Sequence, residues 1–275
     1  MARILILSSF VAASRVGGSA QAVALARLGI EPVLAPTVLF GRHPGHGPPG
    51  GAAVAAEIFE GVLAGIEAQG LFGALDAVIT GYFATPEQVA VAADAVSRIK
   101  ALAPATRIVV DPIMGDADKG LYVREAVAIA IADNLVPRAD LVTPNAWELT
   151  YLTGRPAADA ASAAAAAAKL ARPTLISSVP AGADIGVLYL DGTLGWLATH
   201  APSPVAPKGT GDLLAAFMTS ALVLGLGPRD ALGVSVGSLA ELVAASGADD
   251  PPVTALPTTL IASERVRLEA LGGRG

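Results

Sequence analysis

The sequence predicts an α/β protein with a mostly parallel central sheet that is covered by helices on both faces. Up to Ser178, short β-branched apolar segments alternate with amphipathic segments, which is typical of parallel strands connected by helices. Beyond Ser178 the pattern changes to two apolar segments joined by Asp191-Gly192, a turn sequence that favours a hairpin. We therefore expect antiparallel strands at one edge of the sheet.

Individual elements follow from local patterns. The expected buried strands are 3–7, 77–80, 107–110, 141–143 and 174–177, and the expected hairpin strands are 184–190 and 193–199. Thr85 followed by Pro86 predicts a helix start, and Pro228 starts a helix over 228–245. The apolar segment 213–224 predicts a buried helix. Segment 41–51 is so rich in glycine and proline that we expect neither helix nor strand there.

Length and composition favour a single enzyme-sized domain over residues 1–275. The chain is 53% hydrophobic and 15% charged, with a net charge of −6 and no cysteine, so disulfides and thiolate chemistry are excluded. Its basic residues are scattered, which argues against nucleic acid as a partner. The apolar run 4–7 is too short for a signal peptide, and no apolar stretch reaches the roughly 20 residues that cross a membrane. We expect a cytoplasmic protein without a membrane partner.

One candidate for chemistry is Gly209-Thr210-Gly211-Asp212, which opens the apolar helix predicted next. Glycines ahead of a helix let backbone N–H groups converge on an anion, and the helix N-terminus adds positive partial charge. A carboxylate beside such a site can accept the proton of a hydroxyl group during phosphoryl transfer. The alternative is that Asp212 only caps its helix.

Further candidates lie where predicted strands end, which is where open α/β sheets bind ligands. Asp111 ends one strand, and Asn145 and Glu148 follow another. Two carboxylates suit Mg²⁺, which takes carboxylate, water and phosphate oxygens. The alternative for Asn145 and Glu148 is a capping box at a helix start. Ser177 and Ser178 supply hydroxyls at the end of a further strand.

Seven short motifs follow one another between residues 3 and 245. They are Ser9, Phe40-x-x-His43, Thr80-Gly81-Tyr82, Asp111-Pro112-Ile113-Met114-Gly115-Asp116 with Lys119-Gly120, Pro144-Asn145-x-x-Glu148, Ile176-Ser177-Ser178 and Gly209-Thr210-Gly211-Asp212. In this order they resemble the pyridoxal kinases of the ribokinase-like superfamily. The resemblance implies a ribokinase-like fold, a homodimer, and phosphorylation of the 5′-hydroxyl of pyridoxal to pyridoxal 5′-phosphate. It also implies ATP as co-substrate and Mg²⁺, often with K⁺.

The resemblance assigns expected roles to individual residues. Asp212 is the expected base and also contacts the substrate, while Gly209, Thr210 and Gly211 form the anion hole. The pyridine ring is expected among Ser9, His43, Pro44, Gly45 and Tyr82. Asp111 and Glu148 are expected to act through Mg²⁺ and its waters. With these two, the expected ATP site comprises Asp116, Thr143, Asn145, Ser177, Ser178 and Lys208.

Three positions depart from the family pattern. Phe10 stands where histidine is common, Ser19 where asparagine is common, and Pro44 where threonine is usual. We expect all three to touch the ring side of the site, so they bear on substrate selectivity and leave the preferred B6 vitamer open.

Other functions remain as alternatives. A hydroxymethylpyrimidine kinase shares the fold and the anion hole, although that family often has cysteine in place of Asp212 and lacks Asp116. A sugar kinase is disfavoured because the first strand leads into Ser8-Ser9-Phe10 rather than a segment rich in glycine and asparagine. A non-catalytic binder of pyridoxal phosphate would need a Schiff-base lysine, for which only Lys208 adjoins the anion motif.

Overall fold

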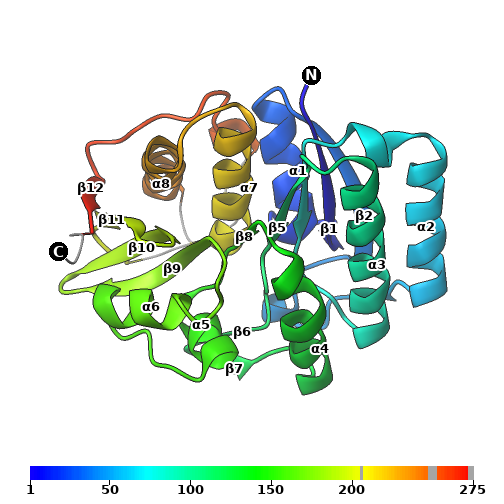
Figure 1. The fold of residues 1–275 in the computed structure, drawn as a ribbon, viewed down its shortest axis with the longest axis horizontal. Coiled ribbons are helices and arrows are strands. Elements are labelled where there is room, and N and C mark those ends of the chain that lie inside the picture. The colour runs from blue at the N-terminus through cyan, green and yellow to red at the C-terminus, as the bar shows by residue number, and fades with distance from the viewer. Residues whose placement is uncertain (205–206, 247–252, 272–275) are drawn as a thin grey trace.

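The computed structural model describes residues 1–204, 207–246 and 253–271. Its centre is a ten-stranded mixed sheet with the strand order β12-β11-β10-β9-β8-β5-β4-β1-β2-β3 (Figure 1). The strands from β2 to β9 pair in parallel, and the strands outside them pair antiparallel at both edges. The α/β class and the mostly parallel sheet predicted from the sequence are confirmed.

The elements follow one another along the chain with short connections. The strands are β1 (Arg3–Val11), β2 (Glu31–Phe40), β3 (Gly51–Ala53), β4 (Ala77–Thr80), β5 (Arg107–Val110), β6 (Gly115–Asp116), β7 (Gly120–Leu121), β8 (Leu141–Val142), β9 (Thr174–Ala181), β10 (Asp184–Asp191), β11 (Leu194–His200) and β12 (Arg267–Ala270). The α-helices are α1 (Gly17–Arg27), α2 (Ala56–Ala68), α3 (Pro86–Leu102), α4 (Glu125–Ala130), α5 (Ala146–Thr153), α6 (Ala160–Ala167), α7 (Thr210–Val223) and α8 (Pro228–Ala245).

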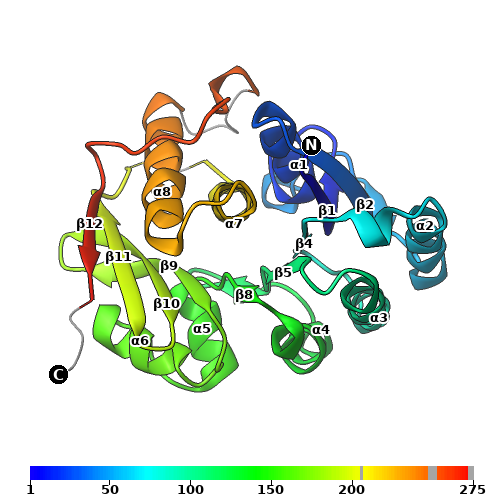
Figure 2. The same cartoon turned by 45° about the horizontal axis from the view of Figure 1, so that its top comes forward.

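Helices cover both faces of the sheet, as Figure 2 shows: α1, α7 and α8 lie on one face and α2 to α6 on the other. The buried strand β1 serves both faces because successive side chains point in opposite directions. Leu5 and Leu7 pack in the cluster with α2 and α3, whereas Ile4 and Ile6 pack in the cluster with α7 and α8. A near-continuous apolar strand is thus explained by burial on both sides.

Several predicted boundaries are confirmed and others need correction. Strands 77–80 and 107–110 and helix 228–245 have the predicted limits, and Thr85 forms a capping box with Gln88 ahead of α3. The first strand runs on to Val11, the fifth runs on to Ala181, and the fourth ends one residue early. The hairpin strands are shifted by one residue at single ends, and α7 starts at Thr210.

The prediction for segment 41–51 is wrong in part. Residues Pro44–His46 form a short 3₁₀ helix that starts with a proline, and Gly51 begins strand β3. The segment is also held by its own backbone, because the N–H groups of Gly41 and Arg42 both donate to the carbonyl of Pro49. The glycines and prolines therefore build a fixed turn that joins β2 to β3.

The carboxyl ends of the parallel strands meet at one edge of the sheet. Connections leave β1 in opposite directions, toward β2 on one side and β4 on the other. Such a reversal of strand order creates a crevice at the carboxyl ends, which is the usual ligand site of open α/β sheets. Within the described residues, no helix is long and apolar enough to cross a membrane.

Candidate active site

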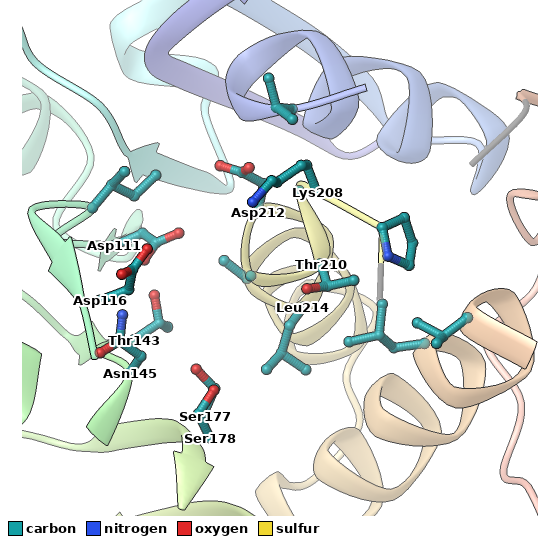
Figure 3. A pocket seen from close by; sticks show the side chains of 18 of the residues that line it. Asp111, Asp116, Thr143, Asn145, Ser177, Ser178, Lys208, Thr210, Asp212 and Leu214 are labelled. Carbon is teal, nitrogen blue, oxygen red and sulfur yellow. The ribbon is translucent and has the colours of Figure 1, made fainter. Parts of the chain in front are cut away.

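A cavity of about 1170 Å³ opens at this edge of the sheet. It is bounded by strand ends on one side and by the N-terminal turn of α7 on the other (Figure 3). All of the site residues predicted from the sequence line it: Ser9, His43, Pro44, Gly45, Tyr82, Asp111, Asp116, Thr143, Asn145, Glu148, Ser177, Ser178, Lys208, Gly209, Thr210, Gly211 and Asp212. The structure thus gathers residues up to about two hundred positions apart into one site, while their roles stay predictions.

The wall formed by the strands carries most of the polar side chains. Asp111 follows β5, Thr143 and Asn145 follow β8, and Ser177 and Ser178 belong to β9. Figure 3 shows these side chains in one column that faces the start of α7. Parallel strands in register place their last residues side by side, so the motifs meet without any long loop.

Asp212 occupies the opposite wall in the first turn of α7. The N-cap of α7 is Gly209, in the left-handed conformation with φ of 81°, so the alternative that Asp212 caps its own helix is wrong. Its Oδ2 instead accepts a hydrogen bond of 2.8 Å from the backbone N–H of Gly17. Its Oδ1 is buried and has no hydrogen-bond partner among the described residues. One oxygen is therefore fixed and the other is left for a ligand.

Asn145 and Glu148 do form the capping box that the sequence left open. The side chain of Asn145 accepts from the N–H of Glu148, and Glu148 Oε2 accepts from the N–H of Asn145, each at 2.9 Å. Glu148 Oε1 also accepts from the N–H of Met114 at 2.8 Å. Both residues also line the cavity, so capping and ligand binding are compatible for this pair.

The buried carboxylates raise one another's pKa values or are raised by burial. Burial, and then the charges of Glu148 and Asp212, raise the pKa of Asp111 well above its usual range. Burial raises the pKa of Glu148 to about 7 and that of Asp212 to about 6. Clustered carboxylates that resist ionisation are typical of sites that receive a cation.

The donor set fits Mg²⁺ bound through water and phosphate. The part of the chain that the structure describes has no group of three or more acidic or histidine side chains arranged to hold a metal. Mg²⁺ does not require such a cage, since it is usually bound through one or two carboxylates plus substrate phosphates. Asp111 and Glu148 are buried, line the cavity and offer carboxylate oxygens of this kind.

The opposite end of the cavity is less polar. Ser9 and Tyr82 lie at the ends of β1 and β4, and the turn after β2 contributes His43, Pro44 and Gly45. The N–H of His43 donates to Ser14 Oγ at 3.3 Å, and the N–H of Gly45 donates to His43 Nδ1 at 3.0 Å. These bonds place the turn over this end of the cavity.

The expectation that all three unusual residues touch the ring side is wrong for two of them. Phe10 is 40% exposed and does not line the cavity. The register between β1 and β2 shifts between Ser8 and Phe10, and Ser9 and Val11 are the residues that face the cavity there. Ser19 is buried and its hydroxyl accepts from the N–H of Val11. Only Pro44 lines the cavity.

Sequence patterns missed two parts of the cavity. An apolar lining comes from α8 through Val236, Leu239, Ala240 and Val243, whose helical spacing resembles ordinary core packing. Gly17 reaches Asp212 from a distance of 195 residues in sequence, for which no local signal exists.

Solved structures and curated proteins resemble this chain over nearly its whole length. The pyridoxal kinase of Leishmania donovani, in complex with ADP and pyridoxamine, superposes with a TM-score of 0.90 at 24% identity and covers 99% of this chain and 100% of its own. The pyridoxal kinase PdxY of Leifsonia xyli is 36% identical over 253 residues, 89% of each chain. The pyridoxine/pyridoxal/pyridoxamine kinase of Bordetella avium is 34% identical over 261 residues, 92% of this chain and 88% of that one.

Fold and site together define a ribokinase-like α/β enzyme. The family model described as phosphomethylpyrimidine kinase matches residues 63–246. The chain belongs to this family, and its curated relatives within it are pyridoxal kinases.

Proposed function

We propose that this protein transfers the γ-phosphoryl group of ATP to the 5′-hydroxyl of pyridoxal, giving pyridoxal 5′-phosphate and ADP. The observation that carries the proposal is the unpartnered Oδ1 of Asp212 at the N-terminus of α7, in a cavity long enough for two ligands. The names of the curated relatives, which include pyridoxal, pyridoxine and pyridoxamine kinases, support this substrate class.

In this mechanism the vitamin lies at the end with Ser9, Tyr82 and the 43–45 turn, and the nucleotide lies along Asn145, Ser177 and the apolar side of α8. Asp212 Oδ1 accepts the proton of the 5′-hydroxyl while that oxygen forms its bond to the γ-phosphorus and the bond to the ADP oxygen breaks. The backbone N–H groups from Gly209 to Gly211 stabilise the charge that develops on the phosphoryl oxygens. Bound Mg²⁺ supplies further neutralisation of the phosphates, held through Asp111 and Glu148.

The test is a set of parallel assays on the purified protein with ATP and Mg²⁺. Pyridoxal, pyridoxine, pyridoxamine and hydroxymethylpyrimidine are each supplied, and the phosphorylated product is quantified. The proposal expects the highest kcat/KM on a B6 vitamer. A preference for hydroxymethylpyrimidine would favour the function after which the family is described, and no product with any of the four would overturn both. A homodimer, a K⁺ requirement and a cytoplasmic location stay predictions from the resemblance.

The glutamate-to-glutamine substitution at position 148 tests the metal role. Glu148→Gln should raise the Mg²⁺ concentration for half-maximal rate about tenfold, because it removes charge from the pair that holds the ion. It should also lower Tm, since an amide cannot accept from the N–H groups of both Met114 and Asn145. Glu67→Gln, which loses an ion pair with Arg98, is the control. A lower Tm with unchanged Mg²⁺ dependence would leave Glu148 with capping alone.

The turn at 41–51 is proposed to exclude water from the vitamin. Replacing residues 44–48 by a Gly-Ser linker keeps Pro49, whose carbonyl anchors the turn, but removes the lining supplied by Pro44 and Gly45. The KM for pyridoxal and the ratio of ATP hydrolysis to vitamin phosphorylation should both rise, because water then reaches the γ-phosphate. The KM for ATP should stay within twofold. Wild-type values for both quantities would exclude this role.

A further inference from the structure

Helices α1 and α7 pack side by side, and both begin at the cavity. Ala20 and Ala24 of α1 share one apolar cluster with Leu213 and Phe217 of α7. The closeness of the two N-termini is measured at Gly209, where an added Cβ would lie 2.3 Å from the carbonyl oxygen of Arg15. A small sliding of one helix against the other would therefore move the groups at this end of the cavity.

The helix α1 holds Asp212 at two points. Its first N–H, from Gly17, donates to the carboxylate Oδ2 at 2.8 Å, and one turn later the side chain Nε2 of Gln21 donates to the main-chain carbonyl of Asp212 at 3.3 Å. The N-cap residue of α1, Val16, offers no side-chain acceptor. The carboxylate of Asp212 thus does for α1 what a capping side chain ordinarily does.

Gln21 is an unusual residue for its place. It is fully buried, and its Oε1 has no hydrogen-bond partner in the described part of the chain. Burying an unpaired amide oxygen costs stability, so a leucine or methionine would suit an ordinary helix interface better. Its only hydrogen bond in the structure as described is the one to the Asp212 carbonyl, and that bond fixes the position of α7 relative to α1.

We propose that Gln21 is a positioning residue for the reaction: it sets the first turn of α7 against α1, so that Gly17 N–H binds Oδ2 and Oδ1 is the atom that accepts the proton. The inference rests on the proposed role of Asp212 as the base. An aspartate side chain is short, so a displacement of its backbone moves the carboxylate by almost the same amount. Misplacement of a reacting group by a fraction of an ångström to one ångström lowers rates by roughly one to two orders of magnitude.

The first experiment is Gln21→Met, which keeps a long side chain and removes the donor. We expect kcat to fall about tenfold, with the KM values for ATP and pyridoxal within twofold, because Gln21 does not line the cavity. The matched control is Thr106→Val, which removes another buried side-chain bond to a carbonyl, that of Leu75 at 2.8 Å, at the opposite edge of the sheet. The control should lower Tm and leave kcat unchanged.

The second experiment is a double-mutant cycle with Asp212→Asn. If Gln21 acts by placing the carboxylate, Gln21→Met should lower the residual rate of Asp212→Asn by less than twofold. The same tenfold loss in both backgrounds would overturn the proposal, as would wild-type kcat in the single variant. If Gln21→Met fails to fold, Gln21→Leu enters the same cycle, since its smaller side chain strains the interface less.

The cycle also separates this inference from the proposed function. Should Asp212→Asn retain wild-type turnover, the base assignment fails and the positioning role fails with it. Should Asp212→Asn lose turnover while Gln21→Met does not, only the positioning role fails.

Discussion

Asp212→Asn is expected to lower kcat by ~10²–10⁴ while the KM for ATP changes by less than twofold. The amide keeps the size of the carboxylate and still offers an oxygen to the N–H of Gly17, so the contact between α1 and α7 survives. What is lost is the basicity of the free oxygen. Steady-state kinetics with pyridoxal and Mg-ATP measure the effect, and Tm checks that the variant is folded.

The pH dependence gives the same prediction a second test. Burial raises the pKa of Asp212 to about 6, so a larger fraction of the carboxyl is protonated, and unable to act as a base, as the pH falls through that value. The rate of the wild type should therefore fall on the acid side of about pH 6. The contribution of Asp212 to this fall should vanish in Asp212→Asn, although Asp111 and Glu148 still titrate.

A matched substitution controls for the loss of a buried carboxylate. Asp140 Oδ2 accepts from the N–H of Ile108 at 2.8 Å, which is the same kind of bond that Asp212 makes, at the opposite edge of the sheet. Asp140→Asn should keep kcat within twofold of the wild type. Equal losses in the two variants would mean that Asp212 acts through stability alone.

Gly209→Ala is expected to produce the second large effect, a fall in kcat/KM of ~10²-fold. Gly209 has φ of 81°, where a side chain is strained, and its Cβ would lie 2.3 Å from the carbonyl oxygen of Arg15. Because the contact is with backbone, α7 must move away from α1, and the N–H groups at its start move with it. Strain of this kind costs about 1–3 kcal/mol of stability, which urea unfolding can measure.

Gly225→Ala separates the strain from the displacement. Gly225 follows α7 with φ of 92°, and an added Cβ there would meet nothing within 4 Å. The variant should lose stability by about 1–2 kcal/mol for the left-handed conformation and keep its kcat/KM. A wild-type kcat/KM in Gly209→Ala would show that the close approach of α7 to α1 does not matter for the reaction.

The sequence by itself determined the α/β class, the central strands and the membership of the site. Strands 77–80 and 107–110 are short, fully apolar and bounded by polar residues, so their limits follow from local pattern. The capping box of Thr85 and Gln88 is equally local. The predicted site residues all line the cavity because each motif ends a strand or starts a helix, and parallel strands bring those points to one edge.

Strands β2 and β12 were beyond the sequence. The first contains Pro32 and Pro36, which interrupt a strand pattern, and is tolerated because β1 pairs with it from one side and β3 covers only its end. The second has four largely exposed residues and exists because β11 offers it a free edge. Neither condition can be read from the segment itself, since each depends on a neighbouring strand.

Only the tertiary structure decided how the site is oriented. The outward position of Phe10 depends on the register between β1 and β2, and a shift of register exchanges the faces to which side chains point. The division of labour between the two oxygens of Asp212 depends on Gly17 and Gln21, which are 195 and 191 residues away. Those contacts arise when two helices pack, and packing is set by the shapes of both surfaces rather than by either sequence segment.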